Sequence, residues 1–124
     1  MSEVDPALRR WFIVHFVIDW LTGLPLLAFP APVLGFLGWH PIDPTATRLF
    51  AAALLGIGGQ SFIGRNAGVG EYRAMLNLKL IWSGAACVGL AVSLLEGAPW
   101  LAAVALAVFL AFFALWAYYR RLIR

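Results

Sequence analysis

The sequence predicts an all-α integral membrane protein, a single domain over residues 1–124 in which four transmembrane helices pack as a bundle. Two observations carry this prediction: a very apolar composition, and four apolar runs with short connections between them. Hydrophobic residues make up 63% of the chain and charged residues only 12%, whereas soluble domains average roughly 45–50% and about 25%. A small soluble domain buries only about 60–70% of the surface that its unfolded chain exposes, so lipid must cover the rest.

The four apolar runs have the length of membrane-crossing helices. They cover residues 11–29, 47–64, 75–95 and 100–119. About 20 apolar residues cross a hydrocarbon core of roughly 30 Å as a helix, and a helix satisfies its own backbone groups in lipid. No alternating pattern indicates a membrane barrel. The first run carries Asp19 and no small-residue cleavage motif follows it, so we expect a retained span rather than a cleaved signal peptide.

The basic residues predict that both termini lie in the cytoplasm. With four spans, the N-terminus, the second connection and the C-terminus share one side of the membrane. Of the nine lysines and arginines, only Arg48 falls on the other side. The shared side holds Arg9, Arg10, Arg65, Arg73, Lys79, Arg120, Arg121 and Arg124. Because positive residues favour the cytoplasmic side, we expect a multi-pass protein of a bacterial cytoplasmic (inner) membrane, and the arginines beside the spans indicate anchoring rather than nucleic-acid binding.

Small residues recur at every fourth position on three of the predicted spans. The rows are Ala52, Gly56 and Gly64 (with Gln60 between them), then Ala85, Gly89 and Ser93, then Ala103, Ala107 and Ala111. Such rows let helix backbones approach closely, which drives association inside lipid. We therefore expect these rows at helix–helix contacts, either within the chain or against a second copy or a partner chain.

Asp19 is the residue of the first span that most needs a partner. It lies about 13 Å of helix rise beyond Arg10, near the middle of the membrane. An ionised carboxylate at that depth costs about 2.5–3.5 kcal/mol on insertion scales. We expect Asp19 to face the bundle interior, in one row with His15 and Gly23. Its nearest polar partner should be Lys79, Gln60 or Asn77, unless the carboxyl group is neutral and protonated.

A polar cluster is expected in the cytoplasmic half of the bundle. Its predicted members are His15, Asp19, Gln60, Asn77 and Lys79. The Lys79 side chain can either extend toward the membrane surface or turn inward toward Asp19. Two roles for this cluster stay open: a structural lock between helices, and a site that moves protons or contacts a ligand.

The sequence predicts no cofactor or metal site. His15 and His40 lie a bilayer apart, so one haem cannot take both as axial ligands. Cys, His and carboxylate residues do not occur at metal-ligand spacing, and the glycines of the second run lie inside a span, where a phosphate loop does not occur. Cys87 is expected to pack as a small apolar residue. A quinone and a lipid both stay open as small-molecule ligands of the chain.

The first connection, residues 30–41, is apolar but too short to cross the membrane. We expect it to lie at the membrane interface as a short helix. It would serve either as a lipid-facing connector or as a lid or docking surface for a partner.

The pattern resembles the DoxX-like class of small bacterial four-helix membrane proteins. The features that carry this resemblance are Arg9 and Arg10 before the first span, the Gly- and Pro-rich first connection, the stretch Leu54-Leu55-Gly56-Ile57-Gly58-Gly59, and the basic connection that ends near Arg73. The resemblance implies an accessory or small subunit of a membrane redox complex, as in a thiosulfate:quinone oxidoreductase. It implies no particular catalytic residue.

These observations lead to one expected function and one alternative. The expected function is a non-catalytic accessory or assembly subunit of a larger, possibly redox, membrane complex, acting as a homo-oligomer or with other membrane subunits. The alternative is a small membrane enzyme or transporter that acts on a hydrophobic or quinone-like molecule at the polar cluster.

Overall fold

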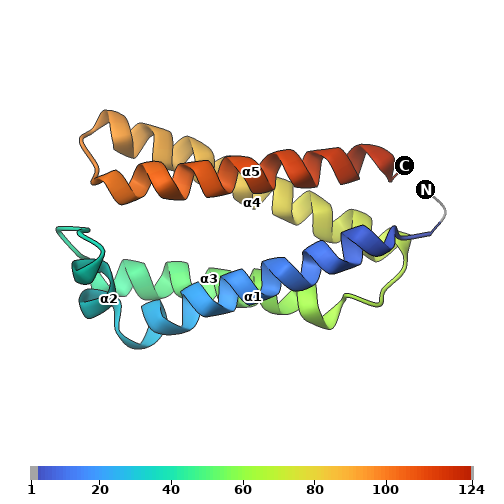
Figure 1. Ribbon diagram of the computed structural model, residues 1–124, viewed down its shortest axis with the longest axis horizontal. Coiled ribbons are helices and arrows are strands. Elements are labelled where there is room, and N and C mark those ends of the chain that lie inside the picture. The colour runs from blue at the N-terminus through green and yellow to red at the C-terminus, as the bar shows by residue number, and fades with distance from the viewer. Residues whose placement is uncertain (1–2, 124) are drawn as a thin grey trace. The chain divides into compact units, whose positions relative to one another are not determined.

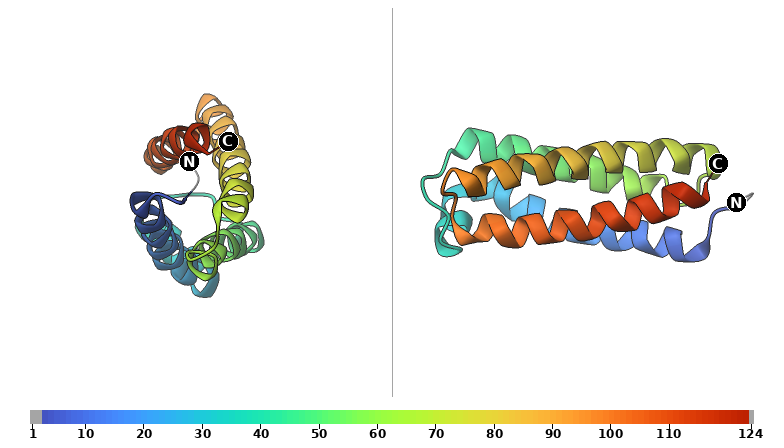
Figure 2. Two further views of the ribbon diagram at one scale, coloured as in Figure 1. Left: turned by 90° about the vertical axis from the view of Figure 1, so that its right-hand side faces the viewer. Right: turned by 90° about the horizontal axis from the view of Figure 1, so that it is seen from above.

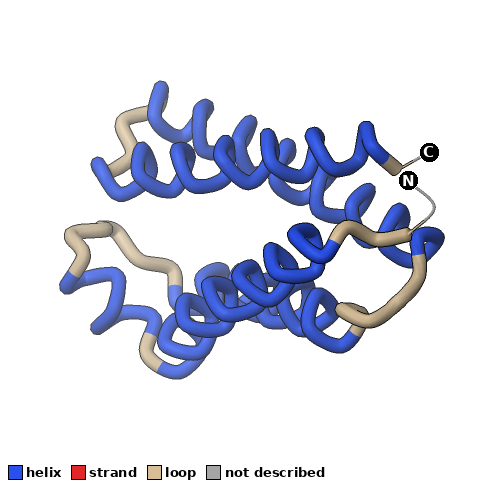
Figure 3. Tube along the Cα trace, turned by 45° about the vertical axis from the view of Figure 1, so that its right-hand side comes forward, coloured by secondary structure: helices blue, strands red, loops and turns tan. Residues whose placement is uncertain are grey.

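The computed structural model describes residues 3–123, and within that range it contains α-helices and no β-strand (Figures 1 and 3). Four of the helices have the length and apolar composition to cross a membrane. They are α1 (Pro6–Ala28), α3 (Pro44–Ile63), α4 (Val69–Leu95) and α5 (Trp100–Leu122). A short helix, α2 (Pro30–Phe36), follows α1. The expected all-α class with four apolar spans is thus confirmed, and these helices fit a multi-pass membrane protein.

Two of the helices begin well before the apolar runs that predicted them. Helix α1 begins at Pro6 rather than at residue 11, because the Asp5 carboxylate accepts a hydrogen bond from the Ala7 amide and Pro6 suits the first turn. Helix α4 begins at Val69, inside the segment expected as a loop. Helical hydrogen bonds do not require apolar side chains, so a helix continues beyond its membrane-crossing part.

The unit Val4–Ala67 is an antiparallel pair of α1 and α3, with α2 packed at the end where the two helices are joined (Figure 1). At one end the Arg9 guanidinium donates a hydrogen bond to the Arg65 carbonyl. At the other end Arg48 Nε donates to the Leu27 carbonyl over 3.0 Å. Helix α3 is capped by Asp43, whose carboxylate accepts hydrogen bonds from two amides of the first turn.

The second unit, which contains Gly68–Arg124, is described up to residue 123; Arg124 lies outside the described residues. Helices α4 and α5 run antiparallel and side by side (Figure 2). They are joined by a tight turn between Leu95 and Trp100, where Gly97 adopts a φ of 90° that other residues rarely adopt. Trp82 packs edge-on against Phe109, with ring centroids 5.8 Å apart.

Large apolar side chains cover much of the outside of both helix pairs. The exposed fraction is 77% for Ile63, 72% for Leu21 and 89% for Leu95. A water-soluble monomer rarely exposes an apolar surface this extensive. A lipid environment accounts for it, because the apolar surface then never meets water.

Candidate functional site

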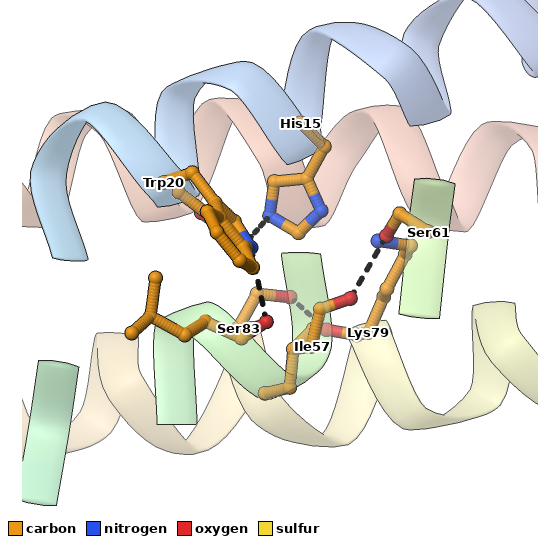
Figure 4. A network of polar contacts seen from close by, with 8 residues as sticks. His15, Trp20, Ile57, Ser61, Lys79 and Ser83 are labelled. Atoms are coloured by element: carbon orange, nitrogen blue, oxygen red, sulfur yellow. Dashed lines mark hydrogen bonds and ion pairs between the residues drawn. The ribbon is translucent and has the colours of Figure 1, made fainter. Parts of the chain in front are cut away.

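Each helix pair contains buried polar side chains, and α1 carries an ionisable pair. His15 and Asp19 are one helical turn apart and only 4% and 5% exposed. His15 Nε2 lies 3.2 Å from Asp19 Oδ2 (Figure 4). Gly23 is buried on the same row. All three residues of this row are thus buried, and Asp19 has a polar neighbour on its own helix, His15.

Helix α3 approaches α1 closely at Gly58. A Cβ atom built on Gly58 would lie 2.6 Å from Asp19 Cβ, a separation that real Cβ atoms essentially never show. A second close approach occurs at Gly23, where a Cβ atom would lie 3.1 Å from Leu55 Cδ2 and 3.3 Å from the Ala51 carbonyl oxygen. Backbone packing at glycine thus encloses Asp19 between α1 and α3.

Two further side chains bind the backbone of α3 beside this ionisable pair. Trp20 Nε1 donates a hydrogen bond to the Leu55 carbonyl across the two helices over 3.1 Å (Figure 4). Ser61, only 1% exposed, donates to the Ile57 carbonyl of its own helix over 3.0 Å. In lipid an unsatisfied polar group costs several kcal/mol, so these bonds satisfy the buried Ser61 hydroxyl and the half-buried Trp20 indole.

The second helix pair buries a lysine. Lys79 is 2% exposed, and its Nζ lies 4.8 Å from the centroid of the Trp116 ring, which is 1% exposed. This geometry is a cation–π contact. The Lys79 carbonyl accepts a hydrogen bond from Ser83 Oγ over 2.6 Å (Figure 4). The Lys79 side chain is therefore buried against Trp116 within its own helix pair rather than extended toward the membrane surface.

Gln60 and Asn77 do not share the buried environment of the other three members of the predicted cluster. Both are exposed. Gln60 is two residues from Gly58, about 200° around α3, and therefore lies on the opposite side from Asp19. Asn77 Oδ1 accepts a hydrogen bond from Arg120 Nε over 2.7 Å, near the end of α5.

The small-residue rows lie largely on the outside of the chain. Ala52, Gly56, Ala85, Gly89, Ala103, Ala107 and Ala111 are exposed. No atom lies within 4 Å of a Cβ atom built on Gly56 or Gly89. Gly64 ends α3 as its C-cap, and Ser93 is half-buried near the end of α4. Gly56 and Gly89 are thus not packed against a neighbouring helix of their own pair.

The sequence analysis passed over Gly58, Trp20, Ser61, Ser83 and Trp116 as site residues. The sequence offered several small residues that could face Asp19, among them Gly56, Gly58 and Gly59, and no feature that singles out Gly58. No signal existed for Trp116 either, since aromatic residues are common in every span. Among the described residues, no group of three His, Cys, Asp or Glu side chains could hold a metal ion.

Comparison of the chain with protein-family models, with curated proteins and with solved structures finds no match in any of the three.

Proposed function

We propose that this chain is a non-catalytic accessory or assembly subunit of a larger membrane complex. In this proposal it inserts as an N-in, C-in four-helix bundle into a bacterial cytoplasmic membrane. The DoxX-like resemblance, carried by its arginine pair and Gly- and Pro-rich connection, favours a redox complex as the assembly.

The observation that carries this proposal is the outward position of the small-residue rows. Gly56 on α3 and Gly89 on α4 are exposed, with no atom of the chain near the place of their missing side chains. In lipid, helices associate through close backbone approach at such positions rather than through a hydrophobic driving force. Exposed glycines on two spans therefore favour contact with further transmembrane helices, either of other subunits or of a second copy.

The hydrogen bonding within each helix pair agrees with a structural role. The side chains of Trp20, Ser61 and Ser83 each donate to a backbone carbonyl within their own helix pair. His15 and Asp19 lie against each other where α1 and α3 pack closely. The Trp20 bond and the contact of Asp19 with Gly58 join α1 to α3 and leave the exposed faces for association.

The proposed orientation is supported separately in each helix pair. Arg9 and Arg65 meet at one end of the first pair, whereas Arg48 binds the Leu27 carbonyl at the opposite end. In the second pair, Arg120 and the acceptor Asn77 lie at the end that also holds Arg73 and Arg121. Each pair thus gathers its basic residues as the positive-inside rule requires.

Photo-crosslinking in the native membrane tests the proposal. A photoreactive amino acid at position 89 should crosslink one defined polypeptide, whereas the same residue at position 91, about 200° around α4, should not. If neither position crosslinks protein, and the purified chain alone in liposomes transports or converts a hydrophobic molecule, the accessory role is wrong.

That second outcome would support the alternative, a small membrane enzyme or transporter for a hydrophobic or quinone-like molecule. The observation that favours it is the buried His15–Asp19 pair, 3.2 Å apart within a span. Ionisable residues in membrane helices are costly, and they frequently mark proton or substrate paths. Loss of the measured turnover in Asp19→Asn with an unchanged fold would assign the activity to this pair.

A further inference from the structure

The segment from Phe29 to Ile42, which includes α2, presents apolar and aromatic side chains outside the four spans. The exposed fraction is 64% for Phe29, 91% for Phe36 and 37% for Leu37. Within α2 only Pro30 is buried. The segment contains no Asp, Glu, Lys or Arg. Exposure of this run to water would be unfavourable, because large apolar side chains gain free energy when they leave water.

The backbone of this segment is ordered by local hydrogen bonds. The Val33 amide donates to the Phe29 carbonyl over 3.1 Å, and the Trp39 amide donates to the Leu34 carbonyl over 2.9 Å. Gly38 adopts a φ of 81° at the turn that follows α2. The segment is thus a structured turn of helix that holds the Phe36 ring away from the rest of the chain.

The length and position of α2 exclude a membrane-crossing role. Seven residues give about 10 Å of helix, roughly a third of a hydrocarbon core. Helix α2 packs against both α1 and α3, at the end of the pair where Arg48 binds the Leu27 carbonyl. That end is where two apolar spans leave the membrane, so the exposed face of α2 continues their apolar surfaces at the level of the lipid headgroups.

We propose that α2 and the turn after it form an interfacial anchor that binds the membrane lipid of one leaflet, with Phe29, Phe36 and Leu37 inserted at the boundary between headgroups and acyl chains. Apolar and aromatic residues on a short uncharged helix are the chemistry that suits this boundary. The anchor fixes the depth of the α1–α3 pair at that surface. The inference rests on membrane insertion of the spans, and its test separates the two.

The test uses the full chain with Cys87→Ser as background, reconstituted in phosphatidylcholine and phosphatidylglycerol liposomes. Phe36→Cys carries an environment-sensitive fluorophore. Leu21→Cys, 72% exposed on α1, is the reference inside the membrane, and exposed Thr45→Cys at the start of α3 is the reference for water. Quenching by lipids with a shallow nitroxide is compared with quenching by aqueous iodide, and circular dichroism confirms that each variant folds.

We expect the probe at position 36 to be quenched several-fold more by shallow nitroxide lipid than by iodide, with the reverse order at position 45. Iodide quenching at position 36 equal to that at position 45 would overturn the anchor. Protection from both quenchers would overturn it as well, because protein rather than lipid would then cover α2. If nitroxide lipid also fails to quench the probe at position 21, the spans themselves are not inserted in the membrane. If position 21 is quenched by nitroxide lipid and position 36 is not, only the anchor is wrong.

Discussion

Asp19 of α1 packs directly on the backbone of Gly58 of α3, so closely that a Cβ atom on Gly58 would lie 2.6 Å from Asp19 Cβ. Asp19 carries a carboxylate that is costly to place in lipid, and it packs at a residue of α3 that has no side chain. This contact excludes lipid and bulk water from one side of the Asp19 carboxylate, and it holds His15 and Asp19 in a closely packed part of the α1–α3 pair. The first prediction follows from this contact.

Gly58→Ala should lower the free energy of unfolding in detergent by about 1–3 kcal/mol, the usual cost of overpacking a tight contact. The matched control is Gly56→Ala, because a Cβ atom there meets nothing within 4 Å. Both substitutions raise helix propensity by about 1 kcal/mol, so their difference isolates the contact with Asp19. Unfolding can be followed by circular dichroism in a denaturant titration. Equal stability of the two variants would contradict the packing described here.

Asp19→Asn should leave the helix content unchanged and cost less than about 1 kcal/mol in stability. An asparagine amide keeps nearly the same size beside Gly58 and still forms hydrogen bonds with His15. Asp19→Leu is the contrasting variant, since its branched apolar side chain fits neither the contact with Gly58 nor the polar neighbour, and it should unfold at a clearly lower temperature. A large loss of stability in Asp19→Asn would mean that the charge itself holds the helices together.

Gly89→Leu should leave the melting temperature of the isolated chain within a few degrees of wild type, because the space around Gly89 is open. The same change should weaken association with another membrane protein or with a second copy, since the leucine separates the helix backbones. Ala91→Leu, also exposed but about 200° around α4, is the control and should keep the association. Light scattering in mild detergent measures the size of the complex that each variant forms. Complexes of identical size in both variants would contradict an interface at Gly89.

Trp116→Ala should cost about 3–5 kcal/mol, the range for removal of a buried tryptophan. Trp116 is 1% exposed, and its ring lies beneath the ammonium group of Lys79. Trp100→Ala removes the same side chain from a position that is 63% exposed on the same helix, and should change stability by about 0.5 kcal/mol at most. Comparable losses in the two variants would show that Trp116 does not organise the α4–α5 pair.

Cysteine labelling in intact cells tests the N-in, C-in orientation. In a Cys87→Ser background, Thr45→Cys should react with a membrane-impermeant maleimide added from outside, because residue 45 begins α3 beside the lone basic residue of the opposite side, Arg48. Asn66→Cys, exposed in the connection after α3, should react only after the cells are opened. Reversed labelling of the two positions would show that both termini lie outside the cytoplasm.

The sequence by itself determined the number, the type and the approximate bounds of the apolar helices. Helical hydrogen bonds are local, and a run of about 20 apolar residues has one stable form in lipid. Composition and run length therefore sufficed to predict the four apolar helices and the short connection before Trp100. The burial of the His15, Asp19 and Gly23 row also followed, because the cost of a carboxylate in lipid allows few other directions.

Only the tertiary structure decided which glycine of α3 faces α1. Gly56 and Gly58 have identical side chains and lie about 200° apart on the helix, so nothing local distinguishes them. The four-residue spacing of small residues that includes Gly56 defines one face of the helix. It does not identify the helix or the lipid that this face contacts. The same holds for Lys79, whose flexible chain can reach either the membrane surface or a neighbouring ring. Trp116 settles that choice, because it places an aromatic face 4.8 Å from the ammonium group from a position far away in the sequence.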